Sequence, residues 1–585
     1  MASPSISGQN AVASSADRRH FLWLMLVALV VLGAGIGLRD PWPSDEPRFT
    51  LVAKQMVASG DWLFPHRGTE LYSDKPPMLM WLEAAAFQVF GNWRVAFLLP
   101  SLLAGLVTLA LTWDLGRRLW NPRVGLFAAA AVLASFQFVY QVKRAQIDPL
   151  VMMWITLANW GLLLHLLRGP NWRAYWLGCF AAGLGVITKG VGVLALLLFL
   201  PYLLALARGW PGVVRVQGAA WRWAGGALAF VVAIAVWLGP MLWAAATRGS
   251  PEYSAYVNDI LFQQTAKRYG GSVGGHAQPF WYYLPVLVLH FFPLSLAYAG
   301  AWRHWVDGLR TRDARLLLLL GWCVLVVVFF SLAGGKREVY LMPILPLLAL
   351  ALAPPLQASL AARWLRVVAW LAALAAGVVL LGGGIWALQG HWTGMQQQIA
   401  ERGLTDNGRW LWWMGIGMGA VFLASALALR PRRGVQALLA GTAGFWLIWG
   451  VWASLLLNDS NSAAGVMRRA GEIAGPQAQI ALVAWKEQNL LMADRPVVSF
   501  GFKKPWARQF EEAVVWQQAQ PEQRWVFALG DAVVPCVVPA RTQVVGYANR
   551  REWWMFRADA VVPGCVPKPP PGAERWDSQY ESDND

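Results

Sequence analysis

The stretch RDPWPSDEPRFTLVAKQMVASGDWLFPHRGTELYSDKPP runs from Arg39 to Pro77, directly after the first hydrophobic segment of the chain. It carries an adjacent acidic pair, Asp45 and Glu46, a further carboxylate at Asp61, and the unit Asp74-Lys75-Pro76-Pro77. Long apolar segments follow it. The sequence therefore predicts a membrane scaffold that presents this loop, or a soluble domain that covers it.

The composition is that of a membrane protein. Of 585 residues, 57% are hydrophobic and 14% are charged, whereas about a quarter of the residues of a soluble domain are charged. The net charge of +17 is explained by arginine-rich cytoplasmic loops, so no nucleic-acid partner is expected. The 37 tryptophans suit interfacial belts and sugar-stacking surfaces alike.

Apolar runs of about 20 residues are long enough to cross a bilayer as helices. We predict a polytopic α-helical protein with thirteen spans. They are 21–38, 94–113, 124–141, 149–167, 174–188, 191–207, 224–246, 281–301, 316–333, 339–353, 365–387, 410–429 and 435–457.

Loop charges predict the orientation, because cytoplasmic loops are enriched in Arg and Lys. Arginine clusters begin with Arg18 and Arg19 and recur on the same side after every second span. Residues 1–20 are therefore predicted to be a cytoplasmic tail, with a retained signal anchor after it because no cleavage site is evident. An odd number of spans then leaves the C-terminal part outside.

Bases on the opposite side are few and need a reason. A shared anionic ligand would supply one, and the alternative is a scatter of snorkelling side chains. These bases are Lys75, Lys143, Arg144, Lys189, Arg248, Lys267, Arg268, Lys336 and Arg337.

The first outer loop, 39–93, is predicted to contain two helices that lie along the membrane surface. Residues 46–59 alternate apolar and polar positions at helical spacing, and Gly60 can end that helix. Residues 78–90 form a second apolar helix after Pro76-Pro77.

Residues 458–566 lose the long apolar runs and are predicted to form a small α/β domain. Strands are expected at 480–484, 497–500, 525–529 and 542–546, and helices at 462–474 and 506–519. Residues 567–585 are rich in proline and acidic residues and are expected to be disordered. Cys536 and Cys565 can pair in an oxidising compartment, which their spacing alone does not establish.

Asp45 and Glu46 have two interpretations. Adjacent carboxylates at the mouth of a membrane protein can act as a general base or position an acceptor. Acidic residues also favour the first turn of a helix, and Pro47 suits an early helical position. Spacing alone favours the helix start, and both roles are compatible.

Asp74 and Lys75 stand before two prolines that stiffen the backbone. A lysine fixed at the membrane surface is a good partner for a phosphate, and the alternative is a solvated salt pair in a turn. Asp74 and His276 are both candidate metal ligands, but two residues are too few to define a site. No cofactor is therefore expected to be required, and the alternative is a divalent metal.

Other candidate residues stand at outer membrane boundaries. Asp148 can cap the span beginning at Pro149, whether or not it also faces a ligand. Lys189, the pair Lys267-Arg268 and the pair Lys336-Arg337 place cations where they can grip the phosphate of a lipid.

Several motifs together resemble the ArnT-like glycosyltransferases of bacteria. These enzymes transfer aminoarabinose to lipid A and belong to the polyprenyl-phosphate-dependent glycosyltransferases of the GT-C fold, which include protein O-mannosyltransferases. The motifs are DE-P-R at 45–48, GDW-x-x-P at 60–65, acid-KPP-x-x-x-W at 74–81, 145–149, GL-x-x-x-TKG at 183–190, P-F-W-Y-Y at 279–283 and K-R-x-x-Y-x-x-P at 336–343. The resemblance covers the membrane part well and the C-terminal part loosely. Asp74 stands where the family often has Glu.

The resemblance implies thirteen helices, a periplasmic active site, a periplasmic C-terminal α/β domain and a sugar donor carried on undecaprenyl phosphate. It implies an acidic catalytic residue at Asp45 and a lysine near the lipid phosphate at Lys75. With the residues above, the predicted site has catalytic, phosphate-binding and metal-binding groups. They are Asp45, Glu46 and Asp148 (catalytic); Lys75, Lys189, Arg268, Lys336 and Arg337 (lipid phosphate); and Asp74 and His276 (metal).

The function predicted on this basis is inverting transfer of a sugar from undecaprenyl phosphate to a periplasmic acceptor, in the bacterial inner membrane. Lipid A or another envelope glycan is the leading acceptor, and membrane lipids surround the site. The alternatives are protein O-glycosylation by the same chemistry and a lipid or solute transporter. A transporter should show paired broken helices in two related halves, and no such repeat is visible in the sequence.

Overall fold

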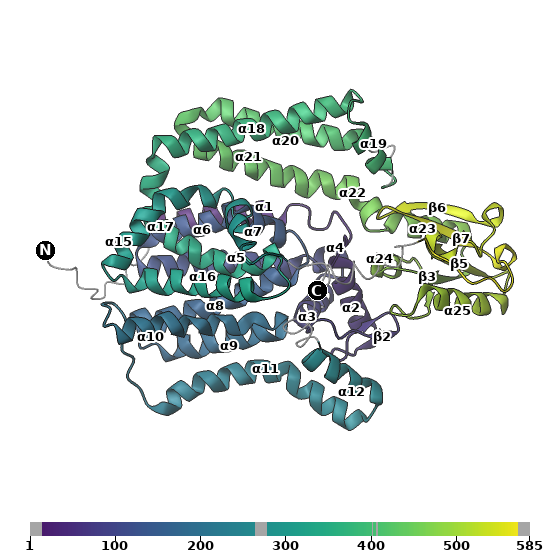
Figure 1. The fold of residues 1–585 in the computed structure, drawn as a ribbon, viewed down its shortest axis with the longest axis horizontal. Coiled ribbons are helices and arrows are strands. Elements are labelled where there is room, and N and C mark those ends of the chain that lie inside the picture. The colour runs from purple at the N-terminus through teal and green to yellow at the C-terminus, as the bar shows by residue number, and fades with distance from the viewer. Residues whose placement is uncertain (1–13, 264–277, 401, 405–407, 571–585) are drawn as a thin grey trace.

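The computed structural model describes residues 14–263, 278–400, 402–404 and 408–570. Figure 1 shows two parts: a large array of long helices and, beyond one end of it, a small domain that contains a β-sheet. The segment with α2, α3 and β2 lies between them. A helical membrane part followed by a C-terminal α/β domain was the architecture predicted from the sequence.

All thirteen predicted spans are helical. The α-helices that form these spans are α1 (Ser15–Gly33), α5 (Leu99–Leu119), α6 (Pro122–Ala134), α7 (Phe136–Val142), α8 (Ile147–Arg168), α9 (Trp172–Lys189), α10 (Phe199–Ala207) with the preceding 3-10 helix Val191–Leu198, α11 (Ala220–Arg248), α14 (Tyr283–Leu289), α15 (Tyr298–Arg310), α16 (Ala314–Leu332), α17 (Leu345–Ala361), α18 (Arg363–Leu388), α20 (Gly408–Leu429), α21 (Gly434–Ile448) and α22 (Ser454–Asn461). Two further helices, α12 (Pro251–Asn258) and α19 (Thr393–Ala400), lie between spans.

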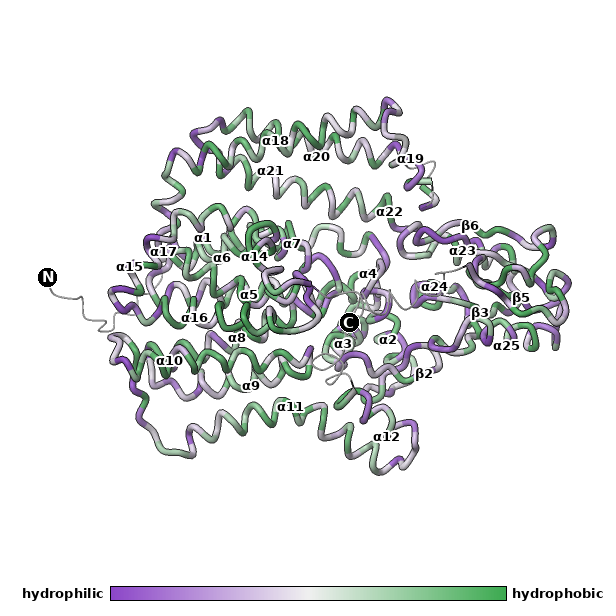
Figure 2. Tube along the Cα trace, viewed as in Figure 1, coloured by the Kyte–Doolittle hydropathy of each residue, from purple (hydrophilic) through white to green (hydrophobic). Residues whose placement is uncertain are grey.

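Within the described residues, eight helices are long and apolar enough to cross a membrane, or up to ten if two bent pairs each count as one span. The predicted spans outside this set are α1, α9 and the 191–207 segment. The first two carry charges at their ends, and the third is shorter. The total of thirteen therefore stays a prediction. Figure 2 shows hydrophobic residues along these helices and hydrophilic residues at their ends and around β2.

Two spans predicted as continuous helices are bent. The pair α6 and α7 is bent by 67° at Ser135, and α14 is bent by 95° against the segment Leu294–Arg310. The backbone N–H of Phe136 donates to the carbonyl of Phe292 at 2.8 Å, and that of Gln137 donates to His290 at 3.0 Å. Each bend thus satisfies polar groups that the other exposes, which an irregular backbone inside a membrane requires.

The first loop contains α2 (Glu46–Ser59), the hairpin β1 (His66–Arg67) and β2 (Glu70–Leu71), α3 (Met78–Phe90) and the short α4 (Trp93–Ala96). Both predicted loop helices are present. Gly60 ends α2 in the left-handed conformation, with φ of 74°, which glycine adopts without strain. Residues 46–53 and Met56 of α2 are buried. Protein therefore covers α2 over most of its length.

The C-terminal sheet has the strand order β4-β3-β5-β7-β6. Its strands are β3 (Gln479–Val483), β4 (Val498–Ser499), β5 (Arg524–Leu529), β6 (Gln543–Ala548) and β7 (Arg551–Phe556). Strand β3 is parallel to β4 and β5, whereas β7 is antiparallel to β5 and β6. All four predicted strands are present, and β7 was not predicted.

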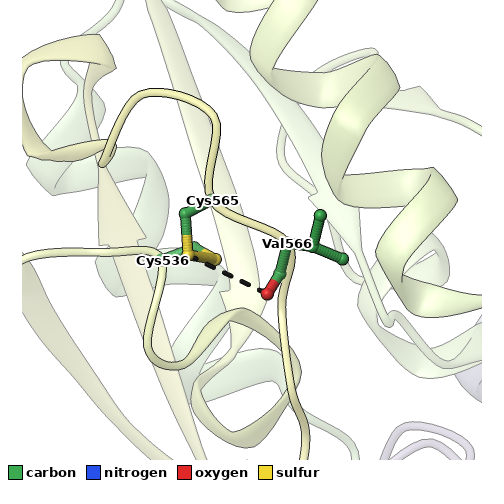
Figure 3. Close-up of a disulfide and its surroundings, with 3 residues drawn as sticks. All are labelled: Cys536, Cys565 and Val566. Carbon is green, nitrogen blue, oxygen red and sulfur yellow. Dashed lines mark hydrogen bonds between the residues drawn. A yellow bond between two sulfur atoms is a disulfide. The ribbon is translucent and has the colours of Figure 1, made fainter.

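Helices α23 (Ala464–Ala474), α24 (Glu487–Leu491), α25 (Trp506–Gln518) and α26 (Gly530–Val533) complete this domain. The two predicted helices correspond to α23 and α25. Cys536 and Cys565 form a disulfide, shown in Figure 3. It ties the segment that follows α26 to the end of the described chain.

Candidate active site

One cavity gathers charged side chains from five separate segments of the chain. Five of the ten predicted site residues meet here, although up to 292 positions separate them in the sequence. The charged residues that line it are Asp45, Lys75, Arg144, Asp148, Lys189, Arg337 and Glu338. Tyr140, Tyr340, Gln141 and Gln146 add polar groups, and Phe49 and Ile147 add apolar surface.

Asp45 stands immediately before α2 and is only 7% exposed. Its backbone carbonyl accepts from Phe49 N–H at 3.1 Å, but its side chain makes no capping hydrogen bond. Among the described residues, no side chain donates a hydrogen bond to this carboxylate. The predicted helix start at Asp45 and Glu46 is therefore confirmed by position. The Asp45 side chain does not act as a cap, and its carboxylate lines the cavity, where a ligand can meet it.

Glu46 has the opposite surroundings. Its carboxylate accepts from Arg39 Nη2 at 2.8 Å, from the Trp42 N–H at 2.8 Å and from the Ala145 N–H at 3.1 Å. Arg39 also contacts it through Nη1. Because Glu46 is 1% exposed and satisfied by these groups, it fixes the start of α2 to the loop at Ala145. It does not line the cavity with Asp45.

Arg144 and Tyr140 were not among the predicted site residues. Arg144 Nη1 donates to the Tyr140 hydroxyl at 3.2 Å, and its guanidinium lies 5.3 Å from the centre of the Tyr140 ring. Burial favours a lower pKa for Arg144, but Glu46, Tyr140 and Asp45 outweigh it and raise the pKa. The sequence signal was present, because Arg144 belongs to the unusual bases of the outer side.

Lys189 and Asp148 form an ion pair of 2.7 Å in the cavity wall. Lys189 Nζ also lies 5.0 Å from the centre of the Tyr340 ring. The expected cap is not formed as predicted: α8 begins at Ile147, with Gln146 at the capping position, so Asp148 lies inside the first turn. The pairing with Lys189 explains why both residues stand at this boundary.

Lys336 and Arg337 separate, although they are neighbours in sequence. Arg337 lines the cavity, whereas Lys336 Nζ donates to the carbonyls of Ala333 at 2.7 Å and Gln278 at 2.9 Å. Lys336 thus stabilises the end of α16. Arg268 and His276 lie outside the described residues.

Asp74 does not line the cavity. Its Oδ2 lies 3.6 Å from Arg67 Nη1. Burial would raise the pKa of Asp74, but Arg67, Lys503, Arg48 and Lys75 together hold it below its usual value. In the described part of the chain, no group of three or more His, Cys, Asp and Glu side chains could hold a metal. Asp74 is thus surrounded by cations, which is a poor environment for a metal ion.

A second cavity lies on the other side of the acidic pair. Its lining includes Glu46 and three tryptophans, Trp42, Trp446 and Trp449. It shares Tyr140 and Arg144 with the first cavity. These two side chains therefore form the wall between the cavities, with Asp45 facing one and Glu46 the other.

The fold defines the class of this protein. It is a multi-pass membrane protein with the GT-C architecture. It superposes on the crystal structure of ArnT from Cupriavidus metallidurans bound to undecaprenyl phosphate with a TM-score of 0.71, over 94% of this chain and 100% of that chain. The apo structure of the same protein gives 0.69. Sequence identity is 19% in both cases, so this likeness concerns the fold.

In sequence the chain is ArnT-like. It is 31% identical over 331 residues to the undecaprenyl phosphate-alpha-4-amino-4-deoxy-L-arabinose arabinosyl transferase of Pseudomonas savastanoi pv. phaseolicola. This match covers 55% of this chain and 58% of that protein. It is 33% identical over 318 residues to the Pseudomonas aeruginosa (strain LESB58) protein of the same name, 53% of this chain and 54% of that protein.

The matches thus span little more than half the length of these curated relatives. Residues 74–238 also match the family described as dolichyl-phosphate-mannose-protein mannosyltransferase. The predicted resemblance to ArnT-like proteins is confirmed.

Proposed function

We propose that this protein is a glycosyltransferase that takes a sugar from undecaprenyl phosphate and transfers it to an envelope glycan, with lipid A as the leading acceptor. The observation that carries the proposal is the cavity in which the Asp45 carboxylate faces Lys75, Arg144, Lys189 and Arg337. The fold of a protein crystallised with undecaprenyl phosphate and the names of the sequence relatives support the same donor.

The cations suit a phosphate leaving group. Inverting transfer needs an acceptor oxygen in line with the anomeric carbon while negative charge develops on the lipid phosphate. Fixed cations in a largely buried cavity stabilise that charge, and such stabilisation is usually the largest single contribution to catalysis. We assign Lys75, Arg144, Lys189 and Arg337 to the phosphate because each lines the cavity.

Asp45 is the proposed catalytic carboxylate. With a hydroxyl acceptor, Asp45 takes the proton as the new glycosidic bond forms and the bond from the anomeric carbon to the phosphate oxygen breaks. With an acceptor that is itself an ionised phosphate, Asp45 positions it or stabilises the positive charge that develops on the sugar.

The remaining predicted residues have supporting roles in this proposal. Glu46 positions α2 through its contacts with Arg39 and Ala145, and Asp148 orients Lys189. Lys336 holds the end of α16. The cationic surroundings of Asp74 do not suit a metal, so no step of the reaction is routed through one.

Protein O-glycosylation is the second candidate. The match of residues 74–238 to a family described as protein mannosyltransferases favours it. The chemistry at the donor would be the same, and only the acceptor would differ. A transporter would move the lipid without breaking the bond between sugar and phosphate, so cleavage of the donor separates it from both enzymes.

We propose an inner-membrane location with the N-terminus in the cytoplasm and the C-terminal domain in the periplasm. The first loop and the α/β domain lie at the same end of the helical part (Figure 1). Arginine-rich loops support a cytoplasmic location for the opposite end. The disulfide between Cys536 and Cys565 suits an oxidising compartment.

The test is mass spectrometry of lipid A and other envelope glycans from cells that lack the protein and carry the wild type, Asp45→Asn or Asp61→Asn. Asp61 is the matched control, because it lies in the same loop, pairs with Arg248 at 3.0 Å and does not line the cavity. We expect a sugar mass that requires the wild type, persists with Asp61→Asn and falls at least a hundredfold with Asp45→Asn.

The outcomes distinguish the candidates. A sugar mass lost from lipid A identifies the acceptor, and one lost only from proteins supports the second candidate. Both enzyme candidates would be contradicted if the sugars on envelope glycans and proteins are unchanged and the purified protein does not cleave an undecaprenyl-linked sugar. Full activity of Asp45→Asn would remove Asp45 from the mechanism.

A further inference from the structure

A buried polar strip joins the C-terminal domain to the first loop. The four consecutive residues Lys486, Glu487, Gln488 and Asn489 open helix α24, and each is 2% exposed or less. Helix α24 packs against α2 of the first loop. Burying four polar side chains in a row is unfavourable unless their partners are specific, so the partners indicate what the strip does.

Glu487 is the centre of this contact. Its Oε1 lies 3.1 Å from Arg48 Nε and 3.5 Å from Arg67 Nη1. The three side chains are between 1% and 3% exposed. Burial would raise the pKa of Glu487, but Arg48, Arg67 and Lys486 outweigh it and lower the pKa, so the carboxylate is ionised where it lies.

Both arginines belong to the elements that carry the proposed active site. Arg48 lies in the first turn of α2, three residues after Asp45. Arg67 lies in β1, and its Nη1 is 3.6 Å from Oδ2 of Asp74, the residue before Lys75. A line of buried charges therefore runs from one side of the cavity, through the C-terminal domain, to the other side.

Glu487 is not the sole tie between the two parts. Lys54 Nζ donates to the carbonyl of Leu491 at 3.3 Å, and the Lys503 N–H donates to Glu70 Oε1 at 3.3 Å. The Arg67 guanidinium also lies 3.9 Å from the centre of the Phe502 ring. The domain thus has other contacts with the loop, and the charge of Glu487 can be removed without removing them.

We propose that Glu487 is a positioning residue for the reaction: through Arg48 and Arg67 it sets the spacing of Asp45 and Lys75, so the C-terminal domain completes the active site without touching the substrate. The expected effect on the rate of transfer rests on the proposed function. The expected effect on the spacing of the loop segments rests on the geometry alone. Removing the carboxylate leaves two buried guanidinium groups facing each other, which drives β1 and the start of α2 apart.

The test uses the purified full chain in lipid nanodiscs. We compare Glu487→Gln and the milder Glu487→Asp with Glu512→Gln as the matched control. Glu512 pairs with Lys504 at 2.7 Å in the same domain, with both side chains more than 40% exposed. Transfer from undecaprenyl-phosphate-linked aminoarabinose to lipid A gives kcat and KM, and hydrogen–deuterium exchange reports on residues 43–52 and 64–77.

We expect Glu487→Gln to lower kcat at least tenfold and Glu487→Asp by a smaller factor, with Glu512→Gln within twofold of the wild type. Exchange should rise in 43–52 and 64–77 while residues 479–483 of β3 stay protected. If Glu487 acts through Arg48, the double variant Glu487→Gln with Arg48→Gln should lose no more activity than the less active of the two single variants.

Two results would overturn the inference. The first is that Glu487→Gln has the same kcat and the same exchange as the control variant. The second is that Glu487→Gln loses activity while exchange rises throughout the C-terminal domain, because that pattern marks a merely structural role. If the wild type and Glu512→Gln transfer no sugar, the proposed function fails. The exchange comparison alone then decides whether Glu487 orders the loop, and unchanged exchange refutes it.

Discussion

Asp45 and Glu46 show how two carboxylates of adjacent residues acquire different roles. Successive residues of a helix project about 100° apart, so the two side chains at the start of α2 leave it on different sides. Glu46 meets Arg39 and two backbone N–H groups, whereas Asp45 faces the cation-lined cavity. The predicted site included both as catalytic residues, because the sequence does not reveal which carboxylate already has partners.

This difference predicts opposite effects of two isosteric changes. Glu46→Gln leaves the buried Arg39 without its carboxylate, and breaking a buried ion pair destabilises a protein by about 3–5 kcal/mol. We expect a lower melting temperature and less folded protein. Asp45→Asn should keep the melting temperature within about 2 °C and lose transfer. Thermal unfolding and transfer measured on the same samples check this, and a reversed pattern would exchange the two roles.

Arg337 and Lys336 provide a second comparison at the scale of single residues. Arg337 lines the cavity, and Lys336 caps α16. A hydrogen bond to a charged group contributes about 1.5–3 kcal/mol. Arg337→Gln should therefore weaken binding of undecaprenyl phosphate at least about tenfold, while Lys336→Gln leaves binding unchanged and lowers stability. An equal loss of affinity in both variants would show that Lys336 and Arg337 both act on the lipid.

At the scale of elements, local patterns predicted the helices and strands well and predicted their distortions poorly. Strand β3 and helix α25 followed from hydrophobic periodicity and composition. The bend at Ser135 was missed because its backbone groups are satisfied by His290 and Phe292, more than 150 residues away. Strand β7 was missed because its two tryptophans and charged residues acquire a strand pattern only through pairing with β5 and β6.

The candidate site was predicted to the extent that local charge carries information. Asp45, Lys75, Lys189 and Arg337 stood out because a charge at a membrane boundary needs a reason. The sequence did not assign Arg144 to the site, did not distinguish Lys336 from Arg337, and gave no indication of Glu487. Each of these depends on a contact with a distant segment.

The disulfide is an element-scale constraint with a measurable consequence. It closes a loop with a sequence separation of 29, and in the chain-entropy model a loop of that length contributes roughly 3–4 kcal/mol to stability. Cys536→Ser combined with Cys565→Ser should lower the unfolding temperature of the C-terminal domain and leave that of the membrane part unchanged. Calorimetry of the full chain, with Cys179→Ser as the control, measures this. An unchanged C-terminal transition would contradict the prediction.

At the scale of the whole molecule, the proposed catalytic loop is held from two sides. The helical part holds it through the Ala145 N–H, which donates to Glu46, and through Asn458 of α22, whose Nδ2 donates to Asp40 Oδ2 at 2.8 Å. The α/β domain holds it through Glu487. The cavity therefore depends on both parts, and a C-terminal domain that shares no side chain with the cavity still bears on its shape.

Acid pH should loosen this joint between the two parts. The pKa values of Glu487 and Asp74 are both held below their usual range, because neighbouring arginines and lysines outweigh the effect of burial. A carboxyl group whose pKa is lowered by folding contributes stability that is fully present above its unfolded pKa, near 4, and is lost as the pH falls through the folded value. Docking of the domain should thus be constant from about pH 8 to 5 and weaken only below about pH 4.

Hydrogen exchange of residues 43–52, measured from pH 8 to below pH 4 and corrected for intrinsic rates, follows the opening of this joint. Glu487→Gln should show faster exchange at neutral pH and a shallower acid response, whereas Glu512→Gln should match the wild type. A midpoint above about pH 5 would contradict the assignment of the joint to Glu487 and Asp74.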